Sequence, residues 1–158
     1  MGRIVSIDGE LLPPERAVVS VFDRGFLYGD SVYEVVRTYG GEPFELDAHL
    51  ARLARSAELI GLQLPRPLEG IAAEVRRTLA ASGNAESSAR IIATRGSGEL
   101  GLDPALSQGG RLMVIVQELV TPPPEAYERG VKLALVGAVS SREAIDPAAK
   151  TGSHLSNV

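Results

Sequence analysis

The sequence of 158 residues contains no cysteine. This absence excludes a disulfide scaffold, a cysteine-ligated zinc site, an iron–sulfur cluster and a thiol nucleophile. No apolar run approaches the ~18 residues of a membrane-spanning helix, and the N-terminus has no apolar signal-peptide core. A net charge of -4 argues against nucleic acid as a partner. These absences favour a soluble, cytoplasmic globular protein that binds neither nucleic acid nor membranes.

Lysine is rare: of the 16 lysine and arginine residues, only Lys132 and Lys150 are lysines. Chemistry that needs a side-chain primary amine therefore has two candidates. Lys132 is out of phase with its apolar neighbours in an expected strand, which is typical of a solvent-facing lysine. Lys150 follows small residues and precedes an expected helix N-terminus, whose positive potential favours a neutral amine. The alternative interpretation of Lys150 is a solvated lysine in a surface loop.

The hydrophobic pattern of the first 120 residues predicts an α+β domain. One helix is expected with Asp47 as its cap and Gly61 at its end, and a second from about Pro67 to Gly83. A polar, Gly-rich loop is expected over residues 96–110. The expected strands cover residues 3–7, 17–22, 31–39, 43–46, 89–95 and 111–118.

Three consecutive prolines, at positions 122–124, predict a stiff linker over residues 121–127. The linker divides an N-terminal domain, residues 1–120, from residues 128–158. The latter is expected to begin a β-rich second domain with a buried strand at 131–139. About 35 residues are too few for a second core, so we expect the sequence to be truncated.

A few polar side chains have more than one interpretation. Arg52, beside the apolar stripe of the first expected helix, can bind a phosphate through two donors or face solvent. Tyr28 and Tyr33 can line a polar pocket or pack in the core with the hydroxyl at its rim. The two histidines, His49 and His154, lack metal-ligand spacing, and no metal site is expected.

Four segments occur together in an informative order. They are residues 22–34 (FDRGFLYGDSVYE), residues 49–57 (HLARLARSA), residues 94–96 (TRG) and residues 149–152 (AKTG). This order and spacing resemble the class IV, or fold type IV, pyridoxal-phosphate enzymes. That family includes branched-chain and D-amino-acid aminotransferases and aminodeoxychorismate lyases. The resemblance covers nearly the whole chain and implies a D-amino-acid aminotransferase-like fold with a small, sandwich-like α/β N-terminal domain.

The resemblance implies pyridoxal 5'-phosphate as the cofactor. Lys150 matches the lysine that forms a Schiff base with it, and Arg52 matches the arginine that grips its phosphate. Tyr33, Tyr28 and Arg90 are the implied substrate-binding residues. A homodimer is also implied, in which Tyr28 or the loop at residues 98–104 reaches the neighbouring site. The acidic partner of the pyridine nitrogen would lie beyond Val158, so a chain ending there is expected to be inactive.

The implied reaction is transfer of an amino group from an amino acid to a 2-oxo acid. The subfamily stays open, because Lys150 is followed by Thr-Gly-Ser and not by the Gly-Gly-Asn-Tyr of the branched-chain enzymes. Ser88 precedes Arg90 where those enzymes carry Tyr-x-Arg, and residues 99–102 lack the Arg-x-His of the D-amino-acid enzymes. One alternative is an aminodeoxychorismate lyase that releases pyruvate and an aminobenzoate. Another is a catalytically incomplete fragment or interaction module.

Overall fold

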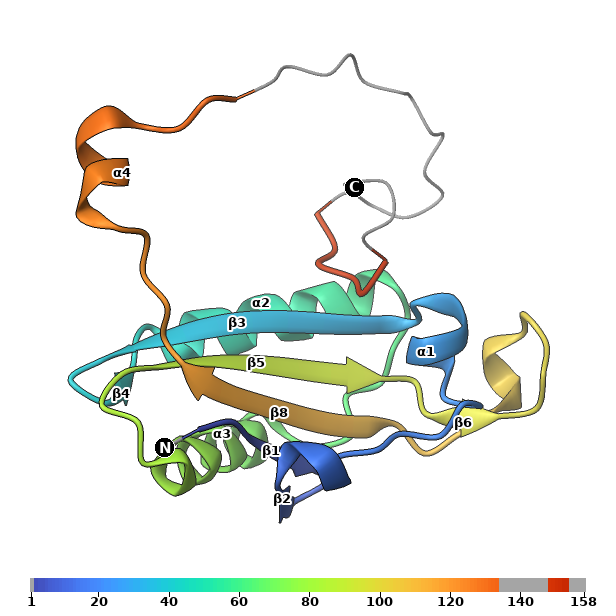
Figure 1. Cartoon of the computed structure of the whole chain (residues 1–158). Coiled ribbons are helices and arrows are strands. Elements are labelled where there is room, and N and C mark those ends of the chain that lie inside the picture. Colours follow the sequence, from blue (N-terminus) through green and yellow to red (C-terminus); the bar gives the residue numbers. More distant parts are fainter. Residues whose placement is uncertain (1, 134–147, 154–158) are drawn as a thin grey trace.

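The computed structural model describes residues 2–133 and 148–153. Its centre is a six-stranded antiparallel sheet in the order β2-β1-β8-β5-β3-β4, with α2 and α3 packed on one face (Figure 1). The six strands are β1 (Ile4–Ile7), β2 (Glu10–Leu12), β3 (Ser31–Tyr39), β4 (Glu42–Pro43), β5 (Ser87–Thr94) and β8 (Arg111–Glu118). The helices are α1 (Arg24–Tyr28), α2 (Leu46–Leu59), α3 (Leu68–Ser82) and α4 (Pro124–Arg129), with two single 3₁₀ turns at Pro14–Arg16 and Pro104–Leu106.

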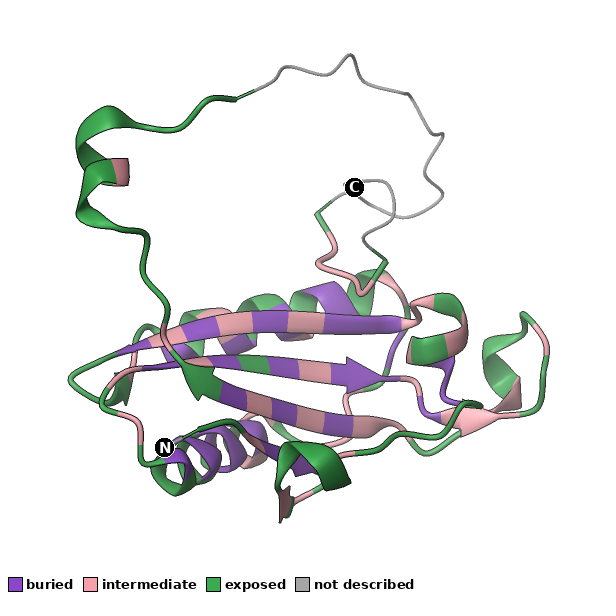
Figure 2. Ribbon diagram, viewed as in Figure 1, coloured by how far each residue is buried: buried purple, intermediate pink, exposed green. Residues whose placement is uncertain are grey.

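The core lies between the sheet and these two helices. Strand side chains alternate between faces, which gives the striped burial of β3, β5 and β8 in Figure 2. Leu53 of α2 and Ile71 of α3 are fully buried against the helix-facing row of the strands. We call the opposite face the open face. Its cross-strand rows are half-buried or exposed and include Tyr33, Val35, Arg90, Ile92 and Met113.

The α+β prediction is confirmed. Two central strands also occur at the residues predicted from the hydrophobic pattern. β3 and β8 have the same bounds as the expected strands at 31–39 and 111–118. Both long helices are also confirmed. Each is followed by a glycine with positive φ, Gly61 at 60° and Gly83 at 65°, a conformation that a side chain disfavours.

The strand predicted at residues 17–22 is wrong. This segment contains no strand, and Val18, Val21 and Phe22 are 74%, 62% and 52% exposed. It follows the Pro14–Arg16 turn, and within residues 2–133 and 148–153 it pairs with no strand, so extended backbone there has no ladder of partners among these residues. An apolar run alone therefore did not make a strand.

Two further expectations about the start of α2 are corrected. The strand expected at 43–46 shrinks to Glu42–Pro43, because α2 already begins at Leu46. Asp47 is not the cap. The cap position is Glu45, with a left-handed φ of 49° and no capping side-chain bond. Asp47 lies inside the first turn, where its negative charge complements the helix dipole.

The Gly-rich loop at 96–110 is more ordered than predicted. It contains a two-stranded ladder, β6 (Ser97–Gly98) with β7 (Ser107–Gln108). At Gly98 a Cβ would lie 2.1 Å from the Leu106 carbonyl oxygen. Glycine is therefore required by the close approach of the two strands.

Beyond β8 the chain leaves the sheet through the prolines into α4, which begins inside the range expected for the linker. The three described residues of the strand expected at 131–139, residues 131–133, are exposed and have no regular structure. The rest of that strand lies outside the described residues. The next described segment, residues 148–153, lies beside the N-terminal end of β3 (Figure 1).

Candidate active site

Lys150 is carried by a segment that adds to the edge of β3. The Tyr33 amide donates to the Lys150 carbonyl at 3.1 Å, and the Gly152 amide donates to the Ser31 carbonyl at 2.9 Å. Val32 and Thr151 between them form an antiparallel bridge. The lysine is therefore positioned by backbone hydrogen bonds of the sheet type.

This register decides where the Lys150 side chain lies. Residues opposite each other on antiparallel strands project to the same face, so Lys150, opposite Tyr33, lies on the open face. Its Nζ is 4.4 Å from the centroid of the Tyr33 ring, and the Arg90 guanidinium carbon is 5.0 Å from the same centroid. Both distances are those of cation–π contacts. Three of the predicted site residues thus meet around one aromatic ring.

Arg52 lies on α2 and is anchored to a buried carboxylate. Its Nε and Nη2 donate to the two oxygens of Glu34 at 2.5 and 2.6 Å, and His49 Nδ1 lies 2.9 Å from Glu34 Oε2. The Glu34 side chain is fully buried, whereas that of Arg52 is 54% exposed. A bidentate pair of this kind fixes the plane of a guanidinium. The pair with Glu34 uses Nε and Nη2 of Arg52 and leaves Nη1 outside the pair.

The protonation of the Glu34 carboxyl follows from this environment. Burial raises its pKa, but hydrogen bonds from Arg52 and His49 and the charge of Arg52 outweigh burial, so the net pKa of Glu34 lies below its ordinary value. The hydrogen bond with Glu34 likewise raises the pKa of Arg52. The pair stays ionised at neutral pH. Its contribution to stability is complete above the ordinary glutamate pKa and is lost as pH falls through the lower, folded-state pKa.

Helix α2 connects the arginine to the lysine. Ser56, one turn after Arg52, is buried, and its Oγ accepts the backbone N–H of Lys150 at 3.1 Å. One turn separates the two helix positions by roughly 6 Å along the axis. The guanidinium and the amine-bearing segment are therefore attached to one rigid element.

Comparison with known proteins assigns the chain to a family. Residues 31–158 match the model of the family described as amino-transferase class IV. The chain belongs to the class IV aminotransferases. Across 155 residues, 98% of the chain, it is 32% identical to a putative branched-chain-amino-acid aminotransferase of Methanocaldococcus jannaschii. The chain covers 53% of that relative, and thus spans about half its length.

Two solved structures of the family resemble the fold. The branched-chain aminotransferase of the thermophilic archaeon Thermoproteus uzoniensis with norvaline has a TM-score of 0.67 and 29% identity, over 76% of this chain and 42% of that chain. The 4-amino-4-deoxychorismate lyase of Pseudomonas aeruginosa has a TM-score of 0.68 and 30% identity, over 80% of this chain and 44% of that chain. The β-sheet with two covering helices is thus the N-terminal part of the class IV aminotransferase fold.

Class IV aminotransferases use pyridoxal phosphate, and the residues present fit that group. The Lys150 amine, in contact with the Tyr33 ring, suits the aldehyde end of the cofactor. A guanidinium held rigid by Glu34 suits the phosphate, because arginine binds phosphate through paired donors. His49 supports the same carboxylate and is part of this anchor. No role was predicted for Glu34 or Ser56 from the sequence, although Glu34 lies in the motif segment 22–34 and Ser56 in the segment 49–57.

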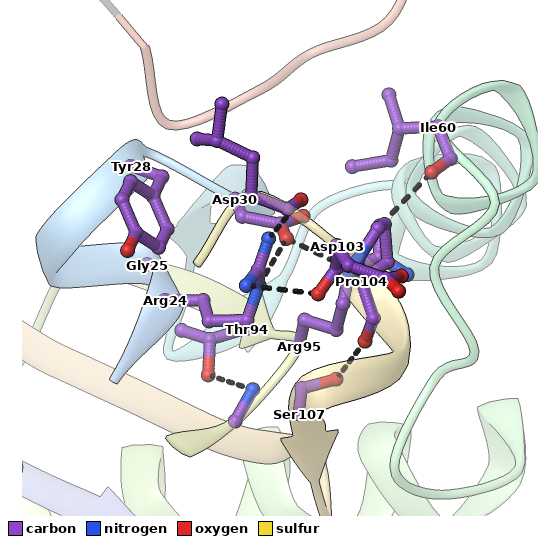
Figure 3. Close-up of polar contacts among 12 residues, drawn as sticks. Arg24, Gly25, Tyr28, Asp30, Ile60, Thr94, Arg95, Asp103, Pro104 and Ser107 are labelled. Carbon is purple, nitrogen blue, oxygen red and sulfur yellow. Dashed lines mark hydrogen bonds and ion pairs between the residues drawn. The ribbon is translucent and has the colours of Figure 1, made fainter. Parts of the chain in front are cut away.

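Tyr28, the other predicted tyrosine, belongs to a different cluster of side chains. Its hydroxyl accepts the amide of Gly101 at 3.3 Å, and the Arg24 guanidinium carbon lies 4.9 Å from its ring centroid. Arg24 and Arg95 both donate to Asp30 Oδ2, at 3.0 and 2.8 Å (Figure 3). Tyr28 thus lies against the loop that follows β6, and the structure does not bring it to the Lys150 contacts described here.

We call Asp30 with Arg24 and Arg95 the Asp30 cluster. Its two arginines connect that loop and the end of α2 to Asp30. The Arg24 guanidinium donates to the carbonyls of three loop residues. Arg95 donates to two carbonyls after α2, of which that of Ile60 is drawn in Figure 3. The accepting residues are Gly101, Leu102 and Asp103 for Arg24, and Ile60 and Gly61 for Arg95. Burial raises the pKa of Asp30, but the hydrogen bonds and charges of Arg95 and Arg24 outweigh it, so the net pKa is lowered.

Asp30→Asn is expected to lower the free energy of unfolding at pH 7 by about 2 kcal/mol, because two charge-assisted hydrogen bonds weaken. The variant should also lose part of the acid sensitivity. With a lowered folded pKa, the Asp30 contribution is complete above the unfolded pKa of about 3.9 and is lost as pH falls from there through the lower, folded-state pKa. Urea unfolding from pH 7 to pH 3 measures both effects. Glu58→Gln, an exposed carboxylate on α2, is the control and should change stability by less than about 0.5 kcal/mol.

The remaining candidates lie apart from this site. Lys132 is exposed next to α4, and His154 lies outside the described residues. Within residues 2–133 and 148–153, no group of three or more His, Cys, Asp or Glu side chains could hold a metal ion. No helix in the described ranges is long and apolar enough to cross a membrane. A surface hollow of about 360 Å³ is lined by residues of α2 and α3. A second, of about 230 Å³, is lined largely by α3 and the turn at β4. Neither is lined by Lys150 or Arg52.

Proposed function

We propose that this protein is a pyridoxal 5'-phosphate-dependent aminotransferase that moves an amino group from an amino acid to a 2-oxo acid. The observation that carries the proposal is the position of Lys150. Its backbone is bonded to β3 and to Ser56, and its Nζ lies 4.4 Å from the Tyr33 ring centroid. A solvated surface lysine would need none of these contacts. Because the chain spans about half of its curated relative, this activity is proposed for the full-length protein.

Each residue has a role that its contacts support. When bound, pyridoxal phosphate supplies an electron sink for the substrate Cα. Lys150 Nζ would hold the cofactor and, once released, move a proton at the substrate Cα. Arg52 would bind the phosphate, with Glu34 fixing the guanidinium plane. Arg90, on the open face beside the Tyr33 ring, would bind the substrate carboxylate.

Tyr33 would form the wall between the lysine and the substrate. Its ring lies in contact with both Lys150 and Arg90. A ring in this place orients the amine through a contact with the ring face and excludes water from the amine.

The proposal for Tyr28 differs. Its cluster supports the loop at residues 98–104, where Leu100 and Leu102 are 69% and 82% exposed. We assign that loop to the contact between two copies in a homodimer, with residues 128–158 belonging to a second domain.

Aminodeoxychorismate lysis is the second candidate function, and the likeness to the Pseudomonas aeruginosa lyase supports it. Both reactions would use the same lysine and the same cofactor. They differ in their products. A transaminase needs an amino acceptor for turnover, whereas the lyase releases pyruvate and an aminobenzoate without one.

The test incubates the full-length protein with pyridoxal phosphate and a panel of amino acids in the absence of an acceptor. We expect one equivalent of 2-oxo acid per site, and continuous turnover only after a 2-oxo acid is added. Pyruvate release from aminodeoxychorismate without an acceptor would select the lyase. Absence of both activities in cofactor-loaded protein would contradict the proposal and favour the catalytically incomplete fragment or interaction module.

A further inference from the structure

We propose that Ser56 is a positioning residue that sets the register of the Lys150 segment on β3. The inference rests on the proposed function, because it assigns Ser56 a task only if Lys150 is the reactive amine. Two observations carry it: the hydrogen bond from the Lys150 amide to Ser56 Oγ, and the narrow space at Gly152 on the same segment.

Register matters here because neighbouring strand residues project to opposite faces. In the observed pairing Lys150 lies opposite Tyr33 and Thr151 opposite Val32, which is fully buried on the helix side. A slip by one residue would turn the Lys150 side chain toward α2 and away from the Tyr33 ring. The backbone bonds at Tyr33 and Ser31 hold the segment along β3, and the bond to Ser56 adds a contact with α2.

Ser56 supplies the bond that discriminates between registers. The amide of Lys150 donates to the Ser56 hydroxyl at 3.1 Å. Ser56 is 1% exposed and lies in the interior of a 14-residue helix, so its Oγ has a fixed position. A buried acceptor left without its donor costs more than an exposed one. In the observed register the Ser56 hydroxyl oxygen accepts the Lys150 amide. In a slipped register it would lose this donor.

Gly152 defines the other end of the same segment. A Cβ at this position would lie 2.2 Å from the Ser31 hydroxyl oxygen, so a side chain at residue 152 would require that hydroxyl to move. The Ser56 bond at Lys150 and the close contact at Gly152 are two residues apart in the chain. Together they hold the lysine from both sides, and the helix that carries Arg52 sets its position.

The experiment compares Ser56→Ala with Ser82→Ala in the full-length protein. Ser82 is a matched control because it is also a buried helix serine, in α3, where its hydroxyl donates to the Leu79 carbonyl. In cofactor-free protein we expect hydrogen exchange at the Lys150 amide to be faster by about 10-fold in Ser56→Ala and unchanged in Ser82→Ala. Ser56→Thr, which keeps the hydroxyl, is expected to restore most of the protection.

A second readout uses Lys132, the other lysine of residues 1–158, as an internal reference. Protein treated with pyridoxal phosphate and borohydride is digested, and the pyridoxyl label on Lys150 is divided by that on Lys132. We expect this ratio to fall several-fold in Ser56→Ala and in Gly152→Ala, which disturbs the segment from its other end. Gly152→Ala provides the same test if Ser56→Ala does not fold.

The inference is overturned if folded Ser56→Ala matches Ser82→Ala in Lys150 exchange and in the labelling ratio. It is also overturned if Gly152→Ala leaves the ratio at the wild-type value. Failure of the proposed function has a different signature. In that case the wild-type ratio would be close to one, while the exchange measurement, which needs no cofactor, would still report on the Ser56 bond.

Discussion

Lys150→Ala is expected to abolish the borohydride-stable pyridoxyl adduct and to lower amino transfer by at least about 10²- to 10⁴-fold, the range typical of a lost proton-transfer group. The physical reason is that the structure places one amine against the Tyr33 ring on the open face, at 4.4 Å from its centroid. Intact mass after reduction and steady-state assays of the full-length protein measure the two effects.

Lys132→Ala is the matched control for this experiment. It removes the other lysine of the chain, which is exposed and lies beyond α4. We expect its adduct and its activity to match those of the wild type. An adduct of equal yield in Lys150→Ala would mean that the cofactor is held elsewhere, and the assignment of the site would be wrong.

Arg52→Ala is expected to weaken binding of pyridoxal phosphate by about 10²-fold, since a hydrogen bond to a charged group contributes roughly 1.5–3 kcal/mol. The variant removes the phosphate donor and also leaves the fully buried Glu34 carboxylate with His49 alone. Unfolding stability should therefore fall as well. Absorbance titration with the cofactor and urea unfolding separate the two effects.

Arg55→Ala provides the comparison, because Arg55 lies on the same helix and is exposed. It should leave cofactor affinity unchanged. Arg52→Lys should recover only part of the affinity, since an ammonium keeps the charge but not the paired donors. Wild-type affinity in Arg52→Ala would show that another group holds the phosphate.

Local patterns predicted those parts of this protein whose cause is local. The alternation of residues 31–39 and 111–118 and the apolar stripes of the two helices are repeated along the chain, so β3, β8, α2 and α3 could be recognised from sequence. The motif segments likewise predicted Lys150 and Arg52 as site residues, and these roles remain proposals. Residues 17–22 show the limit of such patterns. Their apolar composition resembles a strand, but a strand also needs a neighbour, which composition does not supply.

The amino-acid sequence by itself determined which amine and which guanidinium are available, because the chain contains two lysines and one His-x-x-Arg-Leu motif. Only the tertiary structure decided how they are held. Glu34 meets Arg52 across 18 positions, and Ser56 meets Lys150 across 94 positions. Such partners come together through the packing of a helix against a strand edge, and no periodicity along the chain encodes a contact between elements so far apart.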